Sequence, residues 1–443
     1  MTLMNEPIRD RLASVRRRLH RHPEPAWREF LTTARLVEEI RAIGVDELAI
    51  GPDAYDSADR MAVPDADLDP WLERARDRGA DAELLDRMAG GNTGAVAVLD
   101  RGDGPAIGLR VDVDGLFIGE STEPDHDPVD EGFRSEIDGT MHACGHDAHM
   151  TWGLAVLEAI AESDFAGRLV VFFQPAEETG GGGRPMAESR FADDLDYLLA
   201  AHVGLDHPTG EVVAGIEKPL AMAHLDATIE GTSAHAGKAP NEGDNAMQAM
   251  GAAIVNAYGI ARHADGMTRV NVGKAEAGTA SNVIAERAHM EAEVRGETTE
   301  LMEFMKRRFE RTVRGAATMH GCRATVDVVS ECPRADSDPE LQALVAGVAE
   351  GVDGIETVLP AADFGASEDA TFLMERVQED GGLATYLIVG TDHPTSHHTP
   401  TFDVDERSLR HGVDVLVGAI RDLERRHPVP QADAPEDAHP GLE

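Results

Sequence analysis

The chain has 443 residues, 42% of them hydrophobic, which is long enough for two or three domains with hydrophobic cores. Asp and Glu outnumber Lys and Arg by 82 to 40, which gives a formal net charge of −42. Such a charge repels phosphate backbones, so the composition argues against nucleic-acid binding. An acidic surface poor in lysine is typical of a halophile's cytoplasm, where concentrated salt screens the self-repulsion, and we predict a halophilic source.

Nothing in the sequence indicates a membrane span or a secretory signal. No apolar run approaches the roughly 18 residues that cross a bilayer, and no apolar stretch follows the basic cluster Arg16–Arg18. The cysteines Cys144, Cys322 and Cys332 are an odd number in a long chain, which argues against a disulfide framework. We therefore expect a soluble cytoplasmic protein with neither membrane nor nucleic-acid partners.

The N-terminal part mixes helical and extended patterns. Apolar residues spaced by four, three and four between Ile8 and Leu19 predict an amphipathic helix. Residues 52–80 are polar and acidic, and we expect an excursion with one short helix around Trp71–Arg78. Alternation over residues 106–117 predicts a strand with one polar face near its end, and residues 148–162 are expected to form a helix.

Three short apolar runs have the character of strands that are buried on both faces. They are Arg168–Phe173, Tyr197–Ala201 and Ala384–Val389. Strands that alternate with helices in this way predict an α/β domain with a mixed, largely parallel sheet and flanking helices.

The middle of the chain, residues 222–331, follows the order β-α-β-β-α-β, which predicts a small ferredoxin-like α+β domain inserted into the α/β domain. The expected elements are strand His224–Glu230, helix Asn245–Ala261, strands Thr268–Ala275 and Val283–Arg295, helix Thr298–Thr318 and strand Ala324–Val329. The predicted divisions are residues 1–219 and 333–426 for the two halves of the α/β domain, 220–332 for the insertion, and 427–443 for a disordered acidic tail.

Residues with metal-binding side chains follow the predicted strands. The segment Met141–Met150 (MHACGHDAHM) holds three histidines, one cysteine and one aspartate, and the strands are followed by Glu177–Glu178, His202 and His397–His398. Taken singly, the residues after the strands are as easily loop histidines or a solvated acidic pair, whereas Cys144 and His146, at i and i+2, can both turn inward from a loop. Because ligands bind at the carboxyl ends of the strands in a parallel sheet, we expect the four segments to meet at one sheet edge.

Thiolate, imidazole and carboxylate together suit Zn²⁺, Mn²⁺ or a similar divalent ion. Two adjacent glutamates suggest that one binds metal while the other moves protons. A Cys/His nucleophile would explain Cys144 but leave the glutamates and the distant histidines without a role. No Gly-x-Ser-x-Gly occurs, and Gly180–Gly183 lacks nucleotide-binding spacing, so metal-dependent hydrolysis is favoured.

These motifs resemble the signature segments of the M20 metallopeptidases, in the amidohydrolase branch that includes hippurate hydrolases and indole-acetyl-amino-acid hydrolases. The segments are His142–His149, Phe173–Glu178 and His398–Glu406. A narrower likeness to one of the subunits of the p-aminobenzoyl-glutamate hydrolases rests on four stretches. They are the excursion at 52–80, residues 233–237 with 243–246, residues 367–370 and residues 381–386.

The resemblance implies a zinc-peptidase-like domain that binds two divalent ions, Mn²⁺ or Zn²⁺. Cys144 would bridge the ions, with His146 and His202 on one of them and Glu178 and His398 on the other. Glu177 would be the general base, taking a proton from the attacking water and passing it to the leaving amine. Asp112 would orient a metal-binding histidine, although it could equally be part of the strand's polar face.

The inserted domain in this family forms a dimer interface and contributes to the site. The resemblance implies that His235 reaches across to the partner's site and stabilises the oxyanion. It also implies that Asn282 and Arg295 hold the substrate's carboxylate. His235 could instead cap a loop, and Arg295 could be a charge at a strand end. The expected partners are a small acyl-amino-acid substrate and either a second copy or a homologous subunit.

The resemblance implies cleavage of the amide bond of an N-acyl or N-aroyl amino acid, with p-aminobenzoyl-glutamate as the best candidate and hippurate or indole-acetyl-amino acids as alternatives. From another class, the chain could be a catalytically silent subunit that supports a homologous partner. Gly115, Phe117 and Met150 depart from the residues usual in the family, Ala, Pro and Thr, but none of them is an inferred ligand.

Overall fold

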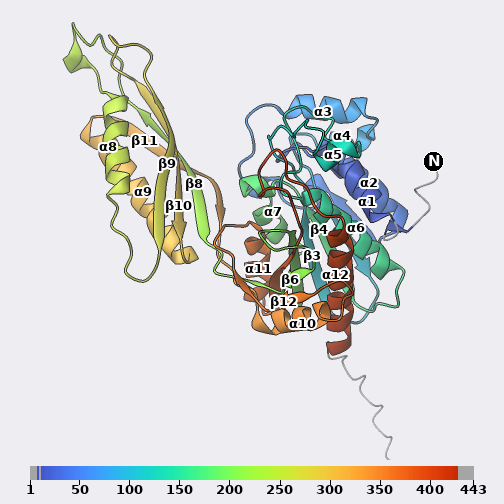
Figure 1. Ribbon diagram of the computed structural model, residues 1–443. Helices are drawn as coiled ribbons and strands as arrows, with labels where there is room; N and C mark the ends of the chain where they lie inside the picture. Colours follow the sequence, from blue (N-terminus) through green and yellow to red (C-terminus); the bar gives the residue numbers. More distant parts are fainter. Residues whose placement is uncertain (1–6, 9–10, 428–443) are drawn as a thin grey trace, which may run out of the picture.

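The computed structural model describes residues 7–8 and 11–427. Figure 1 shows an α/β body, a sheet between helices, and beside it an elongated second body that is joined to it at one end. The predicted acidic tail lies outside the described residues apart from His427. No helix among residues 7–8 and 11–427 is long and apolar enough to cross a membrane.

The α/β body is built on an eight-stranded sheet of order β1-β2-β4-β3-β5-β14-β6-β12. The four central strands, β4, β3, β5 and β14, are parallel, whereas β2 and β6 run antiparallel to their inner neighbours. The strands are β1 (Glu47–Ile50), β2 (Ala95–Asp100), β3 (Ala106–Asp112), β4 (Arg168–Gln174), β5 (Tyr197–Val203), β6 (Glu211–Val213), β12 (Thr357–Leu359) and β14 (Leu383–Val389). A separate parallel pair joins β7 (Ile216–Glu217) to β13 (Ala362–Asp363).

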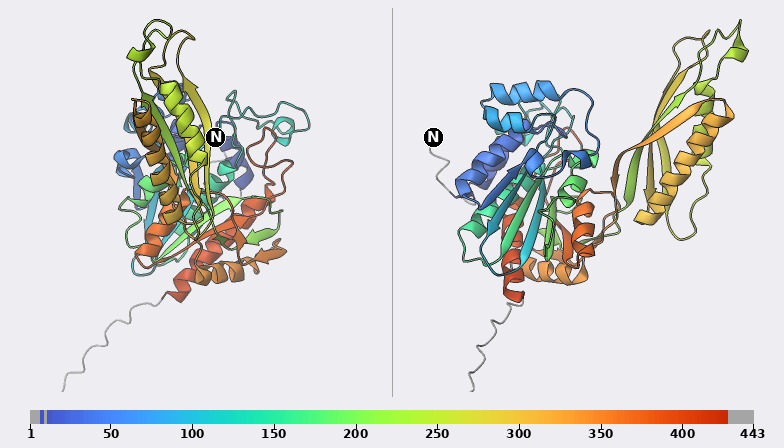
Figure 2. Two further views of the ribbon diagram at one scale, coloured as in Figure 1. Left: turned by 90° about the vertical axis from the view of Figure 1, so that its left-hand side faces the viewer. Right: turned by 180° about the vertical axis from the view of Figure 1, so that it is seen from behind.

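Helices cover both faces of this sheet (Figure 2). The larger hydrophobic core lies under α1 (Leu12–His20), α2 (Phe30–Ile43), α6 (His146–Ala161), α10 (Pro339–Ala349) and α12 (Arg407–Arg426). The opposite face packs against α7 (Gly183–Ala187) and α11 (Ala370–Glu379). Because both faces are covered, the central strands are buried almost throughout, as their unbroken apolar runs predicted.

The acidic excursion contains the one helix expected in it, α3 (Leu68–Asp77), and a second short helix, α4 (Ala82–Arg87), follows it. Both pack against α2 in a small core of their own. Before α3, the chain reaches the second body, where the Ala62 N–H donates to the carbonyl oxygen of Val329 at 2.8 Å. The excursion therefore links the two bodies. Three shorter helical turns are η3 (Gly51–Asp53), η4 (Ser57–Asp59) and α5 (Asp127–Asp130).

The second body is an antiparallel sheet of order β11-β8-β10-β9 with two helices on one face. Its elements are β8 (Ala221–Glu230), α8 (Ala246–Tyr258), β9 (Thr268–Ala277), β10 (Arg287–Gly296), α9 (Thr299–Met319) and β11 (Arg323–Cys332). This is the β-α-β-β-α-β arrangement that the sequence predicted, so the fold class is confirmed, while the domain limits stay a prediction. The helices lie on the side away from the α/β body, and the bare face of the sheet is turned toward it (Figures 1 and 2).

Among the predicted boundaries that differ from the structure, three are informative. The polar-faced strand ends at Asp112, because the chain turns at Gly115 to form a bridge with Pro25. The third strand of the insertion begins at Arg287 rather than Val283, since Val283 lies in a loop and forms an isolated bridge with His235. The helix expected from residue 148 begins at His146, so this histidine lies in a first helical turn and not in a loop.

Candidate metal centre

The candidate ligands gather at the carboxyl ends of neighbouring strands. His202 is near the end of β5, and Glu177 and Glu178 form a short 3-10 turn, η5 (Glu177–Thr179), just after β4. His398 lies on the loop that follows β14, and its backbone N–H donates to the carbonyl oxygen of Ala143 at 2.8 Å. The topology therefore brings together segments that are up to about 250 residues apart in the sequence, as the sheet-edge rule predicted.

A glycine fixes the local geometry of the Met141–Met150 segment. Gly145 caps the N-terminus of α6 with φ of +85°, a conformation that residues with a Cβ rarely adopt. A Cβ at this position would also lie 2.4 Å from Cγ1 of Val203, too close for any other residue. This turn places Cys144 before the helix and His146 in its first turn, so that both side chains face His202.

Two groups of ligand atoms share the sulfur of Cys144. Within each group, all the ligand atoms lie within 4.8 Å of one another. The first is Cys144, His146 and His202, with the sulfur 3.4 Å from His202 Nε2. The second is Cys144, Glu178 and His398, with Glu178 Oε2 3.4 Å from His398 Nε2. Their arrangement is the one that the family resemblance implies for a pair of ions on a shared thiolate.

Two of the candidate donor atoms have no hydrogen-bond partner among the described residues. They are His146 Nε2 and Glu178 Oε1, which are buried and lie 3.8 Å apart. His202 donates from Nδ1 to the carbonyl oxygen of Val203 at 2.8 Å, which leaves its Nε2 directed at Cys144. Buried polar atoms without partners are costly, and a divalent ion would satisfy them, so the residues present fit such ions.

The aspartates of β3 and the turn after it hold two histidines in different ways. Asp114 Oδ1 lies 3.2 Å from His146 Nδ1 and leaves Nε2 for a metal, a typical second contact for a metal-binding histidine. Asp112 lies farther from that atom, at 3.6 Å, and instead bonds His149 Nδ1 at 2.5 Å. The other nitrogen of His149 accepts the Val203 N–H, so both of its nitrogens are engaged within the protein.

Asp112, and not Asp114, was the orienting residue predicted from the sequence. The structure gives the closer contact with His146 to Asp114, whereas Asp112 is one bond removed, on His149. The i, i+2 spacing on one polar face was the signal that could have indicated both. His142, the remaining histidine of the segment, is buried beside His20 and does not line the cavity.

A buried arginine lies beneath the centre. Arg110 has no solvent exposure and donates to Gln174 Oε1 and Asp112 Oδ2, both at 2.8 Å. It also donates to Glu368 Oε1 and Asp369 Oδ1, both at 3.0 Å. One guanidinium therefore neutralises part of the negative charge of three buried carboxylates. Arg110 and the pair Glu368–Asp369 were not among the predicted site residues, although Arg110 lay on the predicted polar strand face.

The two acids bonded to Arg110 face the candidate base. Carboxylate oxygens of Glu177, Glu368 and Asp369 lie within 4.8 Å of one another, and Tyr386 donates its hydroxyl to Glu368 Oε2 at 2.7 Å. Burial, followed by the charge of Glu368, raises the pKa of Glu177 well above its ordinary value. Asp369 also accepts the backbone N–H of Gly183 at 2.8 Å, which ties the start of α7 to the same cluster.

The electrostatics disfavour a Cys/His nucleophile. Burial, with the charges of Glu178 and Glu177, raises the pKa of the Cys144 thiol well above its ordinary value. Burial and the neighbouring His149 lower the pKa of His202, the imidazole nearest the sulfur, well below its ordinary value. A proton would therefore stay on sulfur, and a thiolate at this position requires nearby positive charge, which divalent ions would supply.

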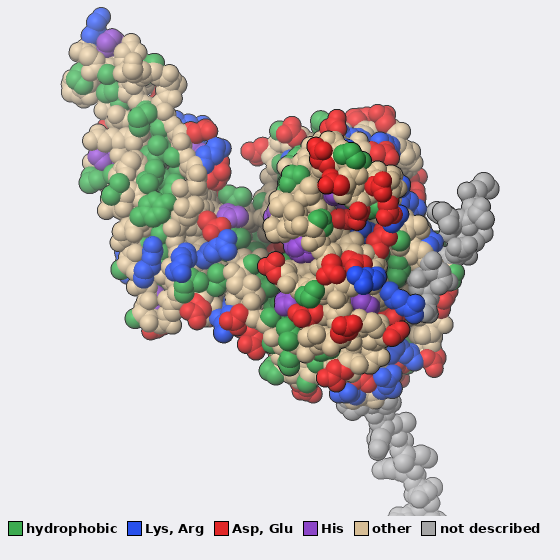
Figure 3. Space-filling model, viewed as in Figure 1, with side chains coloured by type: hydrophobic (Ala, Val, Ile, Leu, Met, Phe, Trp, Pro, Cys, Tyr) green, Lys and Arg blue, Asp and Glu red, His purple; other side chains and the backbone are tan. Residues whose placement is uncertain are grey.

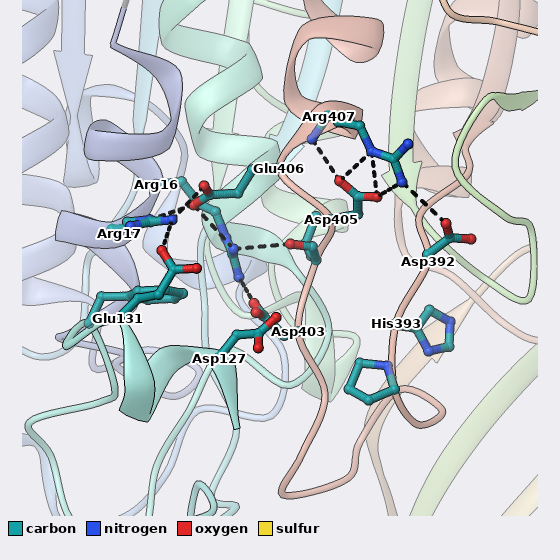
Figure 4. Close-up of a pocket in the computed structure, with 13 residues that line it drawn as sticks. Arg16, Arg17, Asp127, Glu131, Asp392, His393, Asp403, Asp405, Glu406 and Arg407 are labelled. Carbon is teal, nitrogen blue, oxygen red and sulfur yellow. Dashed lines mark hydrogen bonds and ion pairs between the residues drawn. The ribbon is translucent and has the colours of Figure 1, made fainter. Parts of the chain in front are cut away.

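The loop that carries His398 is fastened by ion pairs on its outer side. Arg16 is buried, contacts Asp403 and donates from Nε to Asp147 Oδ2 at 2.9 Å. Arg17 bonds both carboxylate oxygens of Glu406 at 2.7 Å. These pairs join the end of the loop to α1 and α6, and a groove of about 490 Å³ is lined by their outer members, Arg16, Arg17, Asp403 and Glu406 (Figure 4).

A cavity of about 500 Å³ opens from the centre toward the inserted domain. Its walls include Cys144, both glutamates of η5, His202 and His398, together with Arg295 from β10. His235 and Asn282 are not among its walls. They lie together at the far end of the inserted domain, where the Ala236 N–H donates to the Asn282 carbonyl oxygen. One chain therefore brings together eight of the ten predicted site residues, counting Asp112 beneath the centre.

The surfaces of the two bodies differ in character. Figure 3 shows acidic side chains over much of the α/β body and a hydrophobic stripe along the inserted domain. Its exposed apolar residues include Met247, Val255, Tyr258 and Met319, all on α8 or α9. Large exposed apolar areas mark interaction surfaces.

Comparisons with known proteins agree with this site. The model of Peptidase family M20/M25/M40 matches residues 108–422. An indole-3-acetyl-aspartic acid hydrolase of Enterobacter agglomerans is 38% identical over 430 residues, covering 94% of this chain and 97% of its own. One of the subunits of p-aminobenzoyl-glutamate hydrolase from Escherichia coli (strain K12) is 37% identical over 411 residues, with coverages of 92% and 94%.

A solved structure matches over the same length. The aminobenzoyl-glutamate utilization protein of Klebsiella pneumoniae superposes with a TM-score of 0.81 at 31% identity, covering 94% of this chain and 97% of the other. The match with the family model extends over more than half of the chain and includes every candidate metal ligand. The predicted family and enzyme class are confirmed: the chain is a metal-dependent amidohydrolase that belongs to peptidase family M20/M25/M40.

Proposed function

We propose that this enzyme uses two divalent ions, Mn²⁺ or Zn²⁺, to hydrolyse the amide bond of an N-acyl or N-aroyl amino acid, with p-aminobenzoyl-glutamate as the best candidate. The observation that carries the proposal is the pair of ligand groups that share Cys144, with Glu177 beside them. Indole-acetyl-aspartate is the second candidate, favoured by the 38% identity to a hydrolase of that compound. The three cysteines are free and buried, which fits the reducing cytoplasm where we place the protein.

Each residue has a defined part in the proposed reaction. Cys144, His146 and His202 would hold one ion, and Cys144, Glu178 and His398 the other. Ions held there would polarise the scissile carbonyl and make water a nucleophile at neutral pH. Glu177 removes a proton from that water and delivers it to the nitrogen of the leaving amine.

The surrounding residues keep these groups in place. Asp114 fixes the ring of His146, and the network of Arg110 fixes the acids that face Glu177. In the cavity wall, Arg295 offers a guanidinium to the carboxylate of the substrate. The contacts of Asp114 and Arg110 are made before any substrate arrives, so these groups need little reorganisation during the reaction.

A complete site would need a second chain, either another copy or a homologous subunit. His235 is exposed, and its bridge to Val283 joins the two loops at the end of the inserted domain, away from the chain's own cavity. In a dimer joined through the inserted domains, His235 of one chain would stabilise the oxyanion in the other chain's site, with Asn282 beside it at the substrate's carboxylate.

The first experiment measures p-aminobenzoate release from p-aminobenzoyl-glutamate by the purified chain in high salt, before and after chelation. We expect chelation to abolish release and added Mn²⁺ or Zn²⁺ to restore it. Glu177→Gln should abolish turnover while the bound metal stays, whereas Glu178→Gln should lose metal as well. Exposed Glu188→Gln is the matched control and should retain both. Full activity of Glu177→Gln would refute its role, and full activity without metal would refute the mechanism.

The second experiment tests the shared site by mixing two inactive variants, Glu177→Gln and His235→Ala. If each site combines Glu177 of one chain with His235 of another, mixed dimers contain one intact site and regain activity. If the sites are independent, exchange of subunits regains none. A chain that is inactive alone but active with a homologous partner would be identified as a supporting subunit instead.

A further inference from the structure

In the part of the cavity wall that the inserted domain contributes, polar side chains bond to one another. Arg295 donates from Nε to Glu293 Oε1 at 2.6 Å and from a terminal nitrogen to Glu293 Oε2 at 3.1 Å. On the neighbouring strand, His224 Nε2 lies 3.1 Å from the same Oε2, and its Nδ1 lies 3.3 Å from Ser330 Oγ. The fork of Arg295 is therefore already occupied by a carboxylate of its own chain.

The register of the sheet dictates this arrangement. Glu293 and Arg295 are two apart on β10, so they share the bare face of the sheet. His224 is directly opposite Glu293 on β8, and Met222 is opposite Arg295. Glu293, Arg295 and His224 line the cavity at the junction of the two bodies. Their position is fixed by pairing within the sheet and not by a mobile loop.

Arg295 is the only arginine or lysine among the described residues of the cavity wall. The wall also contains Glu177, Glu178, Glu293, Glu368 and Asp369, so an anionic substrate has few partners other than the ions and this guanidinium. The hydrogen bond from His224, with that from Arg295, lowers the pKa of Glu293 to about 2, so its carboxylate is charged at neutral pH. Glu293 and an incoming carboxylate therefore compete for one fork.

We propose that Glu293 is a specificity-determining residue that competes with the substrate's carboxylate for Arg295 and, when displaced, stays bonded to His224. The inference rests on the proposed function, because it assumes that Arg295 binds the carboxylate of an acyl amino acid. Glu293, Arg295 and His224 are all partly exposed, at 28%, 31% and 44%, so the exchange needs only side-chain rotation. Amides without a free carboxylate cannot displace Glu293 and are disfavoured.

The test is the substitution Glu293→Gln. Without the competing charge, the fork is open, and the KM for p-aminobenzoyl-glutamate should fall by roughly threefold to tenfold. This is the range expected if the fork is free about a third to a tenth of the time in the native protein. The kcat should stay within about twofold, and the KM for the corresponding α-carboxamide should not fall, because that analogue has no carboxylate for the fork.

A matched control lies two residues away on the same face of the same strand. Glu291 pairs with Lys274 at 2.7 Å and does not line the cavity, so Glu291→Gln should leave both KM values unchanged. A rise in the KM of Glu293→Gln for p-aminobenzoyl-glutamate would overturn the proposal, because it would show that Glu293 orients Arg295 rather than competing for it. An equal fall for the acid and the carboxamide would also overturn it.

Binding without turnover separates this proposal from the proposed function. Calorimetric titration of p-aminobenzoyl-glutamate into the metal-loaded Glu177→Gln protein gives its affinity, which should rise on adding Glu293→Gln. Tighter binding by the double variant, with no hydrolysis by the native chain, would uphold the competition while refuting the proposed reaction. Unchanged affinity, with hydrolysis by the native chain, would refute the competition alone.

Discussion

Two regions that the proposed function combines in one active site differ in how they are built. Beneath the metal centre, Arg110, Asp112 and His149 are fully buried, and each is held by hydrogen bonds within the α/β body. At the far end of the inserted domain, His235 and Asn282 are exposed and lie on two loops that bond to each other. The contacts of the first region are all made within one chain, whereas the residues of the second lie away from the cavity of their own chain.

The two regions would position their side chains in different ways. The buried region is preorganised because its charges are paired out of water, where removing one partner is costly. The exposed end would obtain its position only by docking, so substitutions there should affect catalysis and leave folding intact. The unfolding free energy is therefore the quantity that distinguishes the two regions.

The largest effect should come from Arg110→Met. The variant would leave three buried carboxylates without their shared cation, and breaking a buried pair in this way costs about 3–5 kcal/mol. Chemical denaturation should show this loss in the unfolding free energy. Arg101→Met, which breaks the exposed pair with Asp46, is the matched control and should cost less than about 1 kcal/mol. Equal losses would show that the buried network does not support the fold.

The next effect concerns His20, which contacts the Met141–Met150 segment. Burial alone would lower the pKa of His20, but bonds to Asp147 at 2.8 Å and Glu120 at 3.0 Å raise it from 6.5 to about 9. The folded pKa exceeds the unfolded one, so the stabilisation is complete below about pH 6.5 and is lost as the pH rises through about 9. It corresponds to about 3 kcal/mol.

The measurement for His20 is the difference in unfolding free energy between the native protein and His20→Gln at pH 6 and pH 9.5. Taking the difference cancels other groups with raised pKa values, such as Glu29, whose pKa burial raises to about 8. The advantage of the native protein should shrink between these pH values by about 3 kcal/mol. An advantage that stays constant would mean that His20 is not charged in the folded protein.

Asp114→Asn should have a smaller effect, expressed through the metal. Loss of the charge beside His146 Nδ1 makes the imidazole of His146 a weaker ligand for a metal ion. Changes of this kind typically cost 10–100-fold in metal affinity. Competition with a chelator measures the affinity, with exposed Asp103→Asn as the control. Because Asp112 lies farther from His146, Asp112→Asn should weaken metal binding less. The opposite order would restore Asp112 to the role predicted for it from the sequence.

The fold was largely predictable because its strongest signals are local. Apolar runs such as Arg168–Phe173 predicted buried strands, and the strand and helix order of residues 222–331 predicted the second sheet. Boundaries were less predictable where turn geometry decides them. Nothing in the periodicity showed that Gly145 would let α6 begin at His146.

The candidate ligands were predictable for a topological reason, since each follows a strand whose end lies at the same sheet edge. The network of Arg110 was not, because it joins residues about 260 positions apart through hydrogen bonds that leave no periodic pattern. The pairing of Glu293 with Arg295 was also missed. An alternating strand that carries both charges on one face was the only available signal.

The smallest effect on stability should come from His235→Gln at the end of the inserted domain. The side chain is exposed, and its Nδ1 accepts only the backbone N–H groups of Gly237 and Lys238, so the unfolding free energy should change by less than about 0.5 kcal/mol. If His235 stabilises the oxyanion in another chain's site, kcat should nevertheless fall by about 10²–10³. His289→Gln, on the bare face of the sheet, is the matched control and should change neither quantity appreciably. Unaltered turnover by His235→Gln would make the buried region sufficient for catalysis, and the exposed end would then serve assembly alone.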